Sequence, residues 1–354
     1  MKNTVKLLMT ISVILSLTCC NAPSKRWSEE KANRWYAQQG WLSGCNYTTS
    51  TAINQIEMWS ADTFDPETID RELGWGEDLG FNTMRVFLSS LVWENDPEGL
   101  KDRMEVFLQI CTDHGIRPFF VFFDDCWDPV SHYGKQREPR PGIHNSGWVQ
   151  DPSVERRRDT LSLYPVLEAY MKDIIGTFRK DKRILMWDVY NEPGNSRHLN
   201  ASIPLLKKSF EWARAARPTQ PLTAAVTCQD FGDLNKIQLE NSDIVCLHTY
   251  SAPELVKHAI DTLKTYGRPV MCTEYMARPF GCSFQSVMPL LKENNVAAVN
   301  WGFVAGKTNT IYPWGGAESY QEPDVWFHDI IRVDGTPFSE EEVKLIRQIN
   351  GKCD

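Results

Sequence analysis

The feature that most constrains the fold is a regular alternation of short apolar runs with segments that favour helix. Strands that alternate with helices are typical of a parallel sheet, and eight such units over about 310 residues match the count and size of a (β/α)8 barrel. We therefore predict an α/β fold, a single (β/α)8 TIM barrel over residues 41–354. The predicted strands are residues 41–47, 82–88, 118–123, 184–189, 222–227, 243–250, 269–275 and 297–303.

The helices are predicted from capping signals and apolar periodicity. Asp65-Pro66-Glu67 is a typical helix start. The segment 97–114 carries apolar residues at helical spacing on one face and ends at Gly115. The other predicted helices are residues 28–39, 153–179, 204–216, 235–240, 253–266, 284–294 and 339–349.

The first forty residues are predicted to be a targeting segment followed by a linker. A basic start precedes an apolar stretch, residues 7–17, that is short for a membrane span and ends near two cysteines. Residues 1–20 resemble a bacterial lipoprotein signal, with Cys19 or Cys20 as the lipidated residue. We expect residues 21–40 to form a tether and a short helix, and the protein to be exported as a periplasmic or outer-membrane lipoprotein.

Charge and cysteine content narrow the possible partners. The formal net charge is −8, and the densest basic run, residues 156–158, is flanked by Glu155 and Asp159. We expect this run to be a solvated helix face rather than a nucleic-acid surface. The cysteines after the signal segment include no CxxC pair, and we interpret most of them as structural thiols while leaving a disulfide open. We expect a monomer that contacts a membrane only through its lipid anchor.

Two predicted strands end on a glutamate. The apolar run 184–189 is soon followed by Glu192 and Pro193, and proline ends the strand because it cannot donate to the sheet. The strand within residues 269–275 likewise ends on Glu274. All strand C-termini of a barrel lie at one face, so the two acids are expected to meet there. Cleavage of a glycosidic bond requires such a pair, one acid to protonate the leaving oxygen and the other to attack or to activate water.

Residues 187–193 and 270–275 resemble the motifs of strands four and seven in clan A of the retaining glycoside hydrolases. Within that clan they resemble glycoside hydrolase family 5, the cellulase and mannanase family. The resemblance covers the barrel and implies that Glu192 is the general acid/base, with a raised pKa, and that Glu274 is the nucleophile. It also implies that Asn191 contacts the sugar 2-hydroxyl.

Four further residues fit this resemblance. His248 and Tyr250 share one face of a strand because side chains alternate; the alternative is a core pair with satisfied hydrogen bonds. The resemblance implies that Tyr250 bonds the nucleophile and that His248 lines the sugar site. Arg85 lies in an apolar run and needs an anionic partner, and the resemblance places it where it keeps the nucleophile ionised. Trp301 matches the aromatic platform beneath the sugar ring.

Other residues after the strands are expected to bind substrate. Apolar sugar faces stack on aromatic rings, and two of the four tryptophans named below are expected to do so. In a departure from the family, Asp124 and Asp125 occupy the place after strand three where a histidine is usual, and they are expected to bond sugar hydroxyls or to serve a cation. The long loop 124–152 is expected to be functional. The four tryptophans are Trp93, Trp127, Trp148 and Trp314.

The sequence therefore predicts a retaining β-glycosidase that hydrolyses β-linked glycans or oligosaccharides by double displacement, with no metal and no cofactor. One alternative is a metal-dependent barrel hydrolase that uses His248, Asp124 and Asp125, although no His-x-His motif follows the first strand. The other is a non-catalytic glycan-binding barrel lipoprotein, in which the paired glutamates would serve no purpose.

Overall fold

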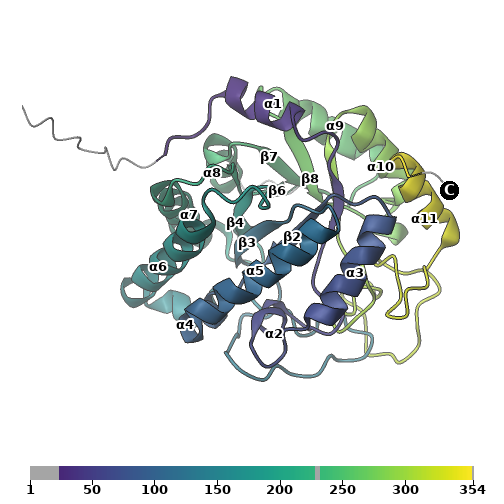
Figure 1. Ribbon diagram of the computed structural model, residues 1–354, viewed down its shortest axis with the longest axis horizontal. Coiled ribbons are helices and arrows are strands. Elements are labelled where there is room, and N and C mark those ends of the chain that lie inside the picture. Colours follow the sequence, from purple (N-terminus) through teal and green to yellow (C-terminus); the bar gives the residue numbers. More distant parts are fainter. Residues whose placement is uncertain (1–23, 228–231, 353–354) are drawn as a thin grey trace, which may run out of the picture.

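The computed structural model describes residues 24–227 and 232–352, and one parallel sheet organises them (Figure 1). Its strand order is β5-β4-β3-β2-β1-β9-β8-β7-β6, and every strand pairing in it is parallel. The strands are β1 Ser43–Asn46, β2 Thr83–Phe87, β3 Phe119–Asp124, β4 Trp187–Asn191, β5 Leu222–Thr223, β6 Val226–Thr227, β7 Val245–His248, β8 Val270–Glu274 and β9 Ala297–Asn300.

The sheet closes through one interrupted strand. β5 pairs with β4, β6 pairs with β7, and only Ala224 and Ala225 separate β5 from β6 along the chain. The strand predicted over residues 222–227 is therefore two short strands, and for this reason eight predicted strands are observed as nine. The predicted α/β barrel is confirmed.

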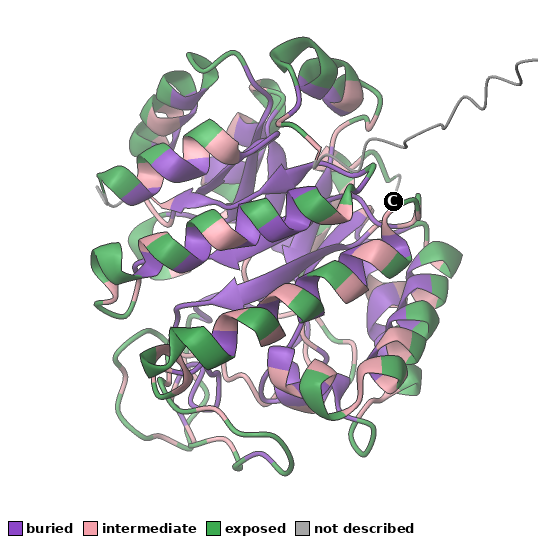
Figure 2. Cartoon of the chain, turned by 90° about the vertical axis from the view of Figure 1, so that its left-hand side faces the viewer, coloured by how far each residue is buried: buried purple, intermediate pink, exposed green. Residues whose placement is uncertain are grey.

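Helices cover the outside of the sheet (Figure 1) and turn their buried sides toward it (Figure 2). On α5 the buried residues are those that the helical spacing predicted. The two short helices α2 and α4 lie in segments for which no helix was predicted. The helices are α1 Glu29–Ala37, α2 Gln55–Trp59, α3 Pro66–Asp78, α4 Ser90–Asn95, α5 Pro97–Asp113, α6 Thr160–Phe178, α7 Ile203–Ala216, α8 Asp233–Asn241, α9 Pro253–Lys264, α10 Phe284–Glu293 and α11 Glu340–Ile349.

The basic run 156–158 is not the solvated helix face that the sequence predicts. It forms a 3-10 turn before α6, and Arg157 lies against the barrel. The Arg157 guanidinium donates to the Tyr190 hydroxyl at 2.9 Å and pairs with the Asp125 carboxylate at 2.6 Å. Asp159 then caps α6 by accepting a backbone N–H from its first turn, so this helix begins later than predicted.

The helix α1 closes the end of the barrel at which the strands begin. Ala32 and Tyr36 of α1 belong to one buried cluster with interior strand residues such as Met271. Ser24, just before α1, donates its backbone N–H to the carbonyl of Arg214 at the end of α7. Because barrel helices run opposite to the strands, the end of α7 lies at the same end of the barrel. The first described residues therefore lie at the end of the barrel opposite to the strand C-termini.

No helix in residues 24–227 and 232–352 has the length and apolar character needed to cross a bilayer. The predicted signal segment with Cys19 and Cys20 lies outside the described residues, as do Cys228 and Cys353. The cysteines found as buried free thiols, in agreement with the structural interpretation, are Cys45, Cys111, Cys126, Cys246, Cys272 and Cys282.

We predict that Asp243 is critical for the stability of the barrel base. Its buried carboxylate accepts hydrogen bonds from two backbone N–H groups and from the guanidinium of Arg214, all at 2.7–2.8 Å. Asp243→Ala leaves that guanidinium without its anion, so the free energy of unfolding should fall by ~3–5 kcal/mol in urea denaturation. The control Asp261→Ala breaks an exposed ion pair with Lys257 and should change it by less than ~0.5 kcal/mol. Equal effects would contradict this assignment.

Candidate functional site

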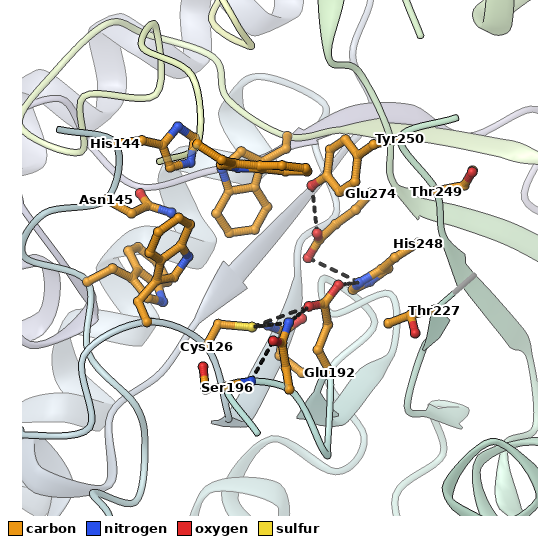
Figure 3. A pocket seen from close by; sticks show the side chains of 16 residues that line it. Cys126, His144, Asn145, Glu192, Ser196, Thr227, His248, Thr249, Tyr250 and Glu274 are labelled. Atoms are coloured by element: carbon orange, nitrogen blue, oxygen red, sulfur yellow. Dashed lines mark hydrogen bonds and ion pairs between the residues drawn. The ribbon is translucent and has the colours of Figure 1, made fainter. Parts of the chain in front are cut away.

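Strands β4, β7 and β8 bring three titratable side chains to the C-terminal face of the barrel. Glu192 directly follows β4, His248 ends β7, and Glu274 ends β8. All three line a cavity of about 630 Å³ (Figure 3). The other residues that line it are Cys126, Trp127, His144, Asn145, Trp148, Asn191, Asn195, Ser196, Thr227, Thr249, Tyr250, Trp301 and Trp314.

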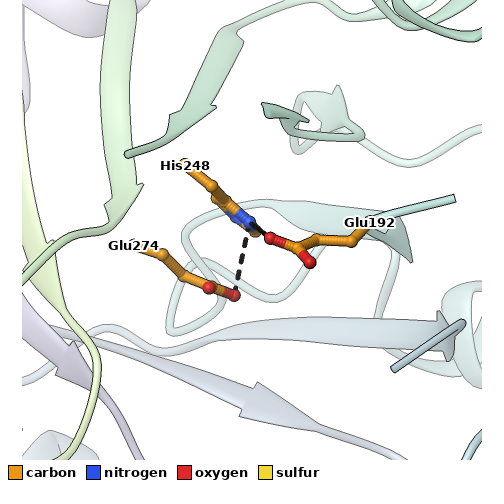
Figure 4. Close-up of side chains that lie close together, drawn as sticks. All are labelled: Glu192, His248 and Glu274. Carbon is orange, nitrogen blue, oxygen red and sulfur yellow. Dashed lines mark hydrogen bonds and ion pairs between the residues drawn. The ribbon is translucent and has the colours of Figure 1, made fainter. Parts of the chain in front are cut away.

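The two carboxylates face each other with His248 between them (Figure 4). His248 Nδ1 lies 2.9 Å from Glu192 Oε1 and 3.4 Å from Glu274 Oε1, and one oxygen of each carboxylate lies within 4.8 Å of the other. Carboxyl groups about 5–5.5 Å apart are typical of a nucleophile and its partner acid, whereas about 6.5–9.5 Å leaves room for an attacking water. The observed spacing is the short one.

The backbone of Glu192 is strained. Its φ is +43°, in the left-handed region that residues other than glycine rarely adopt. Backbone strain of this kind is concentrated at functional sites, where the surrounding structure holds it in place. Here it directs the Glu192 side chain into the cavity immediately after β4 ends.

Glu274 is held by a fixed positive charge and a hydroxyl. Arg85 Nη1 donates to Glu274 Oε1 at 2.7 Å, and the Tyr250 hydroxyl donates to Glu274 Oε2 at 2.7 Å. The Arg85 side chain is completely buried and also pairs with Asp188 at 2.8 Å. The predicted anionic partner of Arg85 is thus a pair of carboxylates. Arg85 itself does not line the cavity, and it acts through Glu274 and Asn191.

Glu192 has a different set of neighbours. Besides His248, its carboxylate accepts hydrogen bonds from the Asn195 side-chain amide and from the Cys126 thiol, the latter at 3.3 Å. The thiol sulfur in turn lies 3.5 Å from the Asn191 amide nitrogen and 3.4 Å from that of Asn195. Glu192 therefore has neutral donors and one histidine, whereas Glu274 has a permanent cation.

In the unliganded protein the pKa values of the two glutamates move in opposite directions. Burial raises the pKa of Glu192, but hydrogen bonding to His248 and its charge, with help from Asn195 and Cys126, outweigh burial and lower it. Burial raises the pKa of Glu274, and His248 and Arg85 offset this only in part. The raised pKa that the sequence led us to expect at Glu192 is therefore not found in the free protein, because His248 lies closer to Glu192 than to Glu274.

Asp124 and Asp125 do not line the cavity, so the prediction that they bond sugar hydroxyls directly is wrong. Asp124 is buried, accepts from the Asn191 amide at 2.8 Å and from the Trp148 indole at 2.7 Å, and burial raises its pKa to about 7. Asp125 accepts from the Tyr190 hydroxyl at 2.6 Å. Both carboxylates position other side chains.

The tryptophans divide between cavity and core. Trp301 lines the cavity as expected, Trp127 and Trp314 stand at its rim with 37% and 39% of their surface exposed, and Trp148 lines it although it is nearly buried. Trp93 does not reach the cavity; its indole donates to Asp173 at 2.8 Å. Trp93 was one of four candidates of which two were expected to bind substrate, and it is excluded because α4 turns it toward α6.

Several residues of this site were not identified from the sequence. Asp188 had a signal, because a charged residue inside an apolar strand needs a partner and Arg85 is one. Cys126 and Asn195 had no signal, since their contacts with Glu192 depend on loop conformation. His144 and Asn145, on the loop after β3, were missed for the same reason.

One cluster among the described residues could offer three ligands to a metal ion, and it consists of Glu192, His248 and Glu274. The set His248, Asp124 and Asp125, which the metal-dependent alternative requires, is not assembled there. The guanidinium of Arg85 lies 2.7 Å from Glu274 and would repel a cation at that carboxylate. The geometry therefore favours acid–base and nucleophilic chemistry by the carboxyl groups.

Comparison with solved structures identifies the fold. An exo-β-1,4-mannosidase from Opitutaceae bacterium strain TAV5 superposes with a TM-score of 0.61 at 16% identity, over 88% of this chain but only 60% of that one. A GH5_18 protein from Streptomyces cattleya, in complex with GlcNAc, gives 0.60 at 12% identity over 88% and 81%. An endo-1,4-β-D-mannanase from Thermotoga petrophila RKU-1 gives 0.57 at 15% identity over 88% and 99%.

Comparison by sequence gives no relative: no protein-family profile and no curated protein matches the chain. The structural identities are too low to transfer an activity or a residue role. They confirm the predicted likeness to the barrel of glycoside hydrolase family 5 at the level of the fold.

Two substitutions should separate the two carboxyl groups in a pH profile of kcat/KM on an aryl β-glycoside, and a third should affect both groups. Tyr250→Phe removes a hydrogen bond that lowers the pKa of Glu274, and Cys126→Ala removes one that lowers the pKa of Glu192. Each should move one limb of a bell-shaped profile to higher pH. His248→Asn removes interactions of the imidazole that lower the pKa values of both glutamates, so both limbs should move to higher pH.

The limb that moves identifies the group. A basic limb that moves in Cys126→Ala means that Glu192 is protonated in the active form. Tyr320→Phe, at a position 92% exposed, is the matched control and should leave the profile unchanged. The site description is wrong if Cys126→Ala and Tyr250→Phe move the same limb.

Proposed function

We propose that this protein is a retaining β-glycosidase that hydrolyses β-linked oligo- or polysaccharides, with Glu274 as nucleophile and Glu192 as general acid/base. One observation carries the proposal: the two carboxylates face each other at the short spacing, and of the two only Glu274 contacts Arg85 and Tyr250. A protein that merely binds glycans has no use for this asymmetry, because it gives one carboxylate of the pair a permanent counterion.

The proposed reaction proceeds by double displacement. Glu274 attacks the anomeric carbon, the bond from that carbon to the leaving oxygen breaks, and Glu192 donates its proton to that oxygen. The product of this step is a glycosyl ester of Glu274. Glu192 then takes a proton from water as the water attacks the same carbon, which releases the sugar with its original configuration and regenerates both carboxyl groups.

The proposed mechanism requires the proton on Glu192 and the negative charge on Glu274. Two carboxylates this close do not both ionise freely, so one of them tends to hold a proton. Of the two, only Glu274 contacts the permanent positive charge of Arg85, and we propose that this contact places the proton on Glu192 in the catalytic state.

The remaining residues of the cavity suit a sugar ring. Asn191 has its amide fixed on both sides, since its oxygen accepts from Arg85 at 2.8 Å and its nitrogen donates to Asp124, and it lies where a 2-hydroxyl would be held. Trp301 offers an aromatic face beside Glu274, and Trp127 offers another at the rim. Aromatic faces bind the apolar sides of sugars while the polar groups fix the hydroxyls.

The structural neighbours suggest which sugar to test first. They include a mannosidase, mannanases and GH5_18 proteins in complex with GlcNAc or Manb1-4GlcNAc. We therefore place β-1,4-linked mannosides first among the candidate substrates, followed by the gluco- and xylo-configured equivalents.

Glu274→Ala should abolish turnover, because Glu192 is the one other carboxylate that lines the cavity among the described residues, and it serves as the proton donor. Incubation with 2-deoxy-2-fluoro glycosides activated at C1 should add the mass of one sugar to the wild-type protein, at Glu274. Glu192→Ala should lower kcat by ~10²–10⁴-fold on substrates with poor leaving groups and by less on aryl glycosides with good ones.

Glu318→Gln is the control for these two variants, since Glu318 is exposed and lies outside the cavity. It should retain wild-type activity and labelling. A label on another carboxylate, or normal turnover by folded Glu274→Ala, would refute the assignment of the nucleophile.

Chelation should not alter the activity. The proposed chemistry uses only carboxyl groups, and the Arg85 guanidinium opposes a cation at Glu274. Dialysis against EDTA should therefore leave kcat and KM on an aryl β-glycoside unchanged. A loss that is restored by added divalent metal would favour the metal-dependent alternative.

A further inference from the structure

We propose that the cavity is closed at its glycone end, so that the enzyme removes the terminal, non-reducing sugar from a β-linked chain instead of cutting within it. The inference rests on the proposed function and adds to it the mode of attack. It is carried by three loops that meet over one side of the barrel mouth: residues 47–54 after β1, residues 125–152 after β3 and residues 301–338 after β9, which we call the loop wall.

The loop wall is joined by hydrogen bonds between all three loops. Asn54 Nδ2 donates to the Gly147 carbonyl at 2.8 Å, which links the first loop to the second. The backbone N–H of Asn145 donates to the Thr308 carbonyl at 2.8 Å, which links the second loop to the third. Lys307 N–H donates to the Ser50 carbonyl at 3.1 Å, which links the third back to the first.

The three loops touch so closely that no polysaccharide chain can pass between them. A Cβ added to Gly147 would lie 2.2 Å from the Ile53 side chain, and one added to Gly306 would lie 2.5 Å from the Cα of Ser50. Glycine is required at Gly306 because its backbone rests directly on the backbone of Ser50, whereas Gly147 rests on the side chain of Ile53. The packed loops therefore close the side of the barrel mouth at which an endo-acting enzyme would need an open cleft for the polysaccharide.

The inner face of the wall carries polar atoms without partners. Asn145 is 3% exposed, and neither the nitrogen nor the oxygen of its side-chain amide makes a hydrogen bond within the described protein. His144 is 2% exposed, and its Nε2 atom likewise makes no hydrogen bond there. Both residues line the cavity. An unpaired buried polar atom is unfavourable because it has lost its hydrogen bonds to water, so these atoms are suited to the hydroxyl groups of a terminal sugar.

The wall stands close to the nucleophile. Trp301 donates its backbone N–H to the carbonyl of Tyr275, the residue after Glu274. The centroids of the Trp301 and Trp148 rings lie 6.0 Å apart, and the backbone N–H of Trp148 donates to the carbonyl of Asn145 at 3.0 Å. This short series of contacts connects the wall to the strand that carries Glu274, so a sugar bound beside Glu274 meets the wall.

Among residues 24–227 and 232–352, the open side of the cavity lies at the general acid. The leaving group must depart next to Glu192, because this residue protonates its oxygen. Figure 3 shows His144 and Asn145 at one end of the cavity and Glu192, Ser196 and Thr227 toward the other. Ser196 is exposed, unlike Asn145. The rest of the substrate therefore extends past Glu192 into solvent, and its terminal sugar faces the wall.

The test uses hexasaccharides of β-1,4-mannose, β-1,4-glucose and β-1,4-xylose that carry a fluorescent label at the reducing end. The first labelled product of the sugar that is cleaved should be the pentasaccharide, with release of the free monosaccharide, followed by the tetrasaccharide. Early appearance of labelled di- or trisaccharide would mean internal cutting and would overturn the inference while leaving the proposed function intact. No cleavage of any hexasaccharide or aryl β-glycoside, with no labelling of Glu274, would overturn both.

Asn145→Ala provides an independent test. If Asn145 holds the sugar that is cleaved off, kcat/KM should fall by the same factor, about tenfold, on an aryl β-monosaccharide and on the hexasaccharide. A fall on the hexasaccharide alone would place Asn145 at a second sugar and refute the closed end. Arg140→Ala is the matched control, because it breaks the exposed ion pair with Glu318 on the outside of the wall and should leave both values unchanged.

Discussion

The site depends on one buried guanidinium. Arg85 projects from β2 into the barrel with no exposed surface, and a charge in that position must be balanced because an unpaired buried ion costs several kcal/mol. Asp188 supplies one balancing carboxylate, the Asn46 side chain accepts another N–H, and Glu274 supplies the second carboxylate. The charge balance of the barrel interior therefore decides which of the two cavity glutamates has a permanent counterion. Nucleophile and fold are linked through the same cation.

The sequence was sufficient to predict a site residue where a charged side chain lies in or directly after an apolar strand. Glu192 and Glu274 end apolar strands, and Arg85 interrupts one, so each required an explanation that a barrel mouth provides. The direction of a side chain near a strand end was beyond this reasoning. β3 continues to Asp124, one residue further than predicted, and this single residue decides that the Asp124 carboxylate points into the protein interior, beneath Asn191, and not into the cavity.

The conformation of the loops was the other feature that could not be predicted from the sequence. Cys126, Asn195 and Asn145 reach the cavity from segments whose backbone includes left-handed residues such as Trp127 and Asn145 itself, and such conformations are set by contacts between loops that lie far apart in the chain. The wall exists only because glycines of one loop meet side chains and backbone of another. Spacing along a sequence does not contain that information, although the length and composition of residues 124–152 did indicate a functional segment.

The position of α1 has a consequence for how the barrel meets large substrates. Because α1 covers the end of the barrel where the strands begin, residue 24 lies at the end of the barrel opposite to the cavity. A barrel attached to a surface through its N-terminus would present its mouth outward, away from that surface. Insoluble or bulky glycans would then approach from the side that faces away from the surface. Released sugars would diffuse away from the point of attachment.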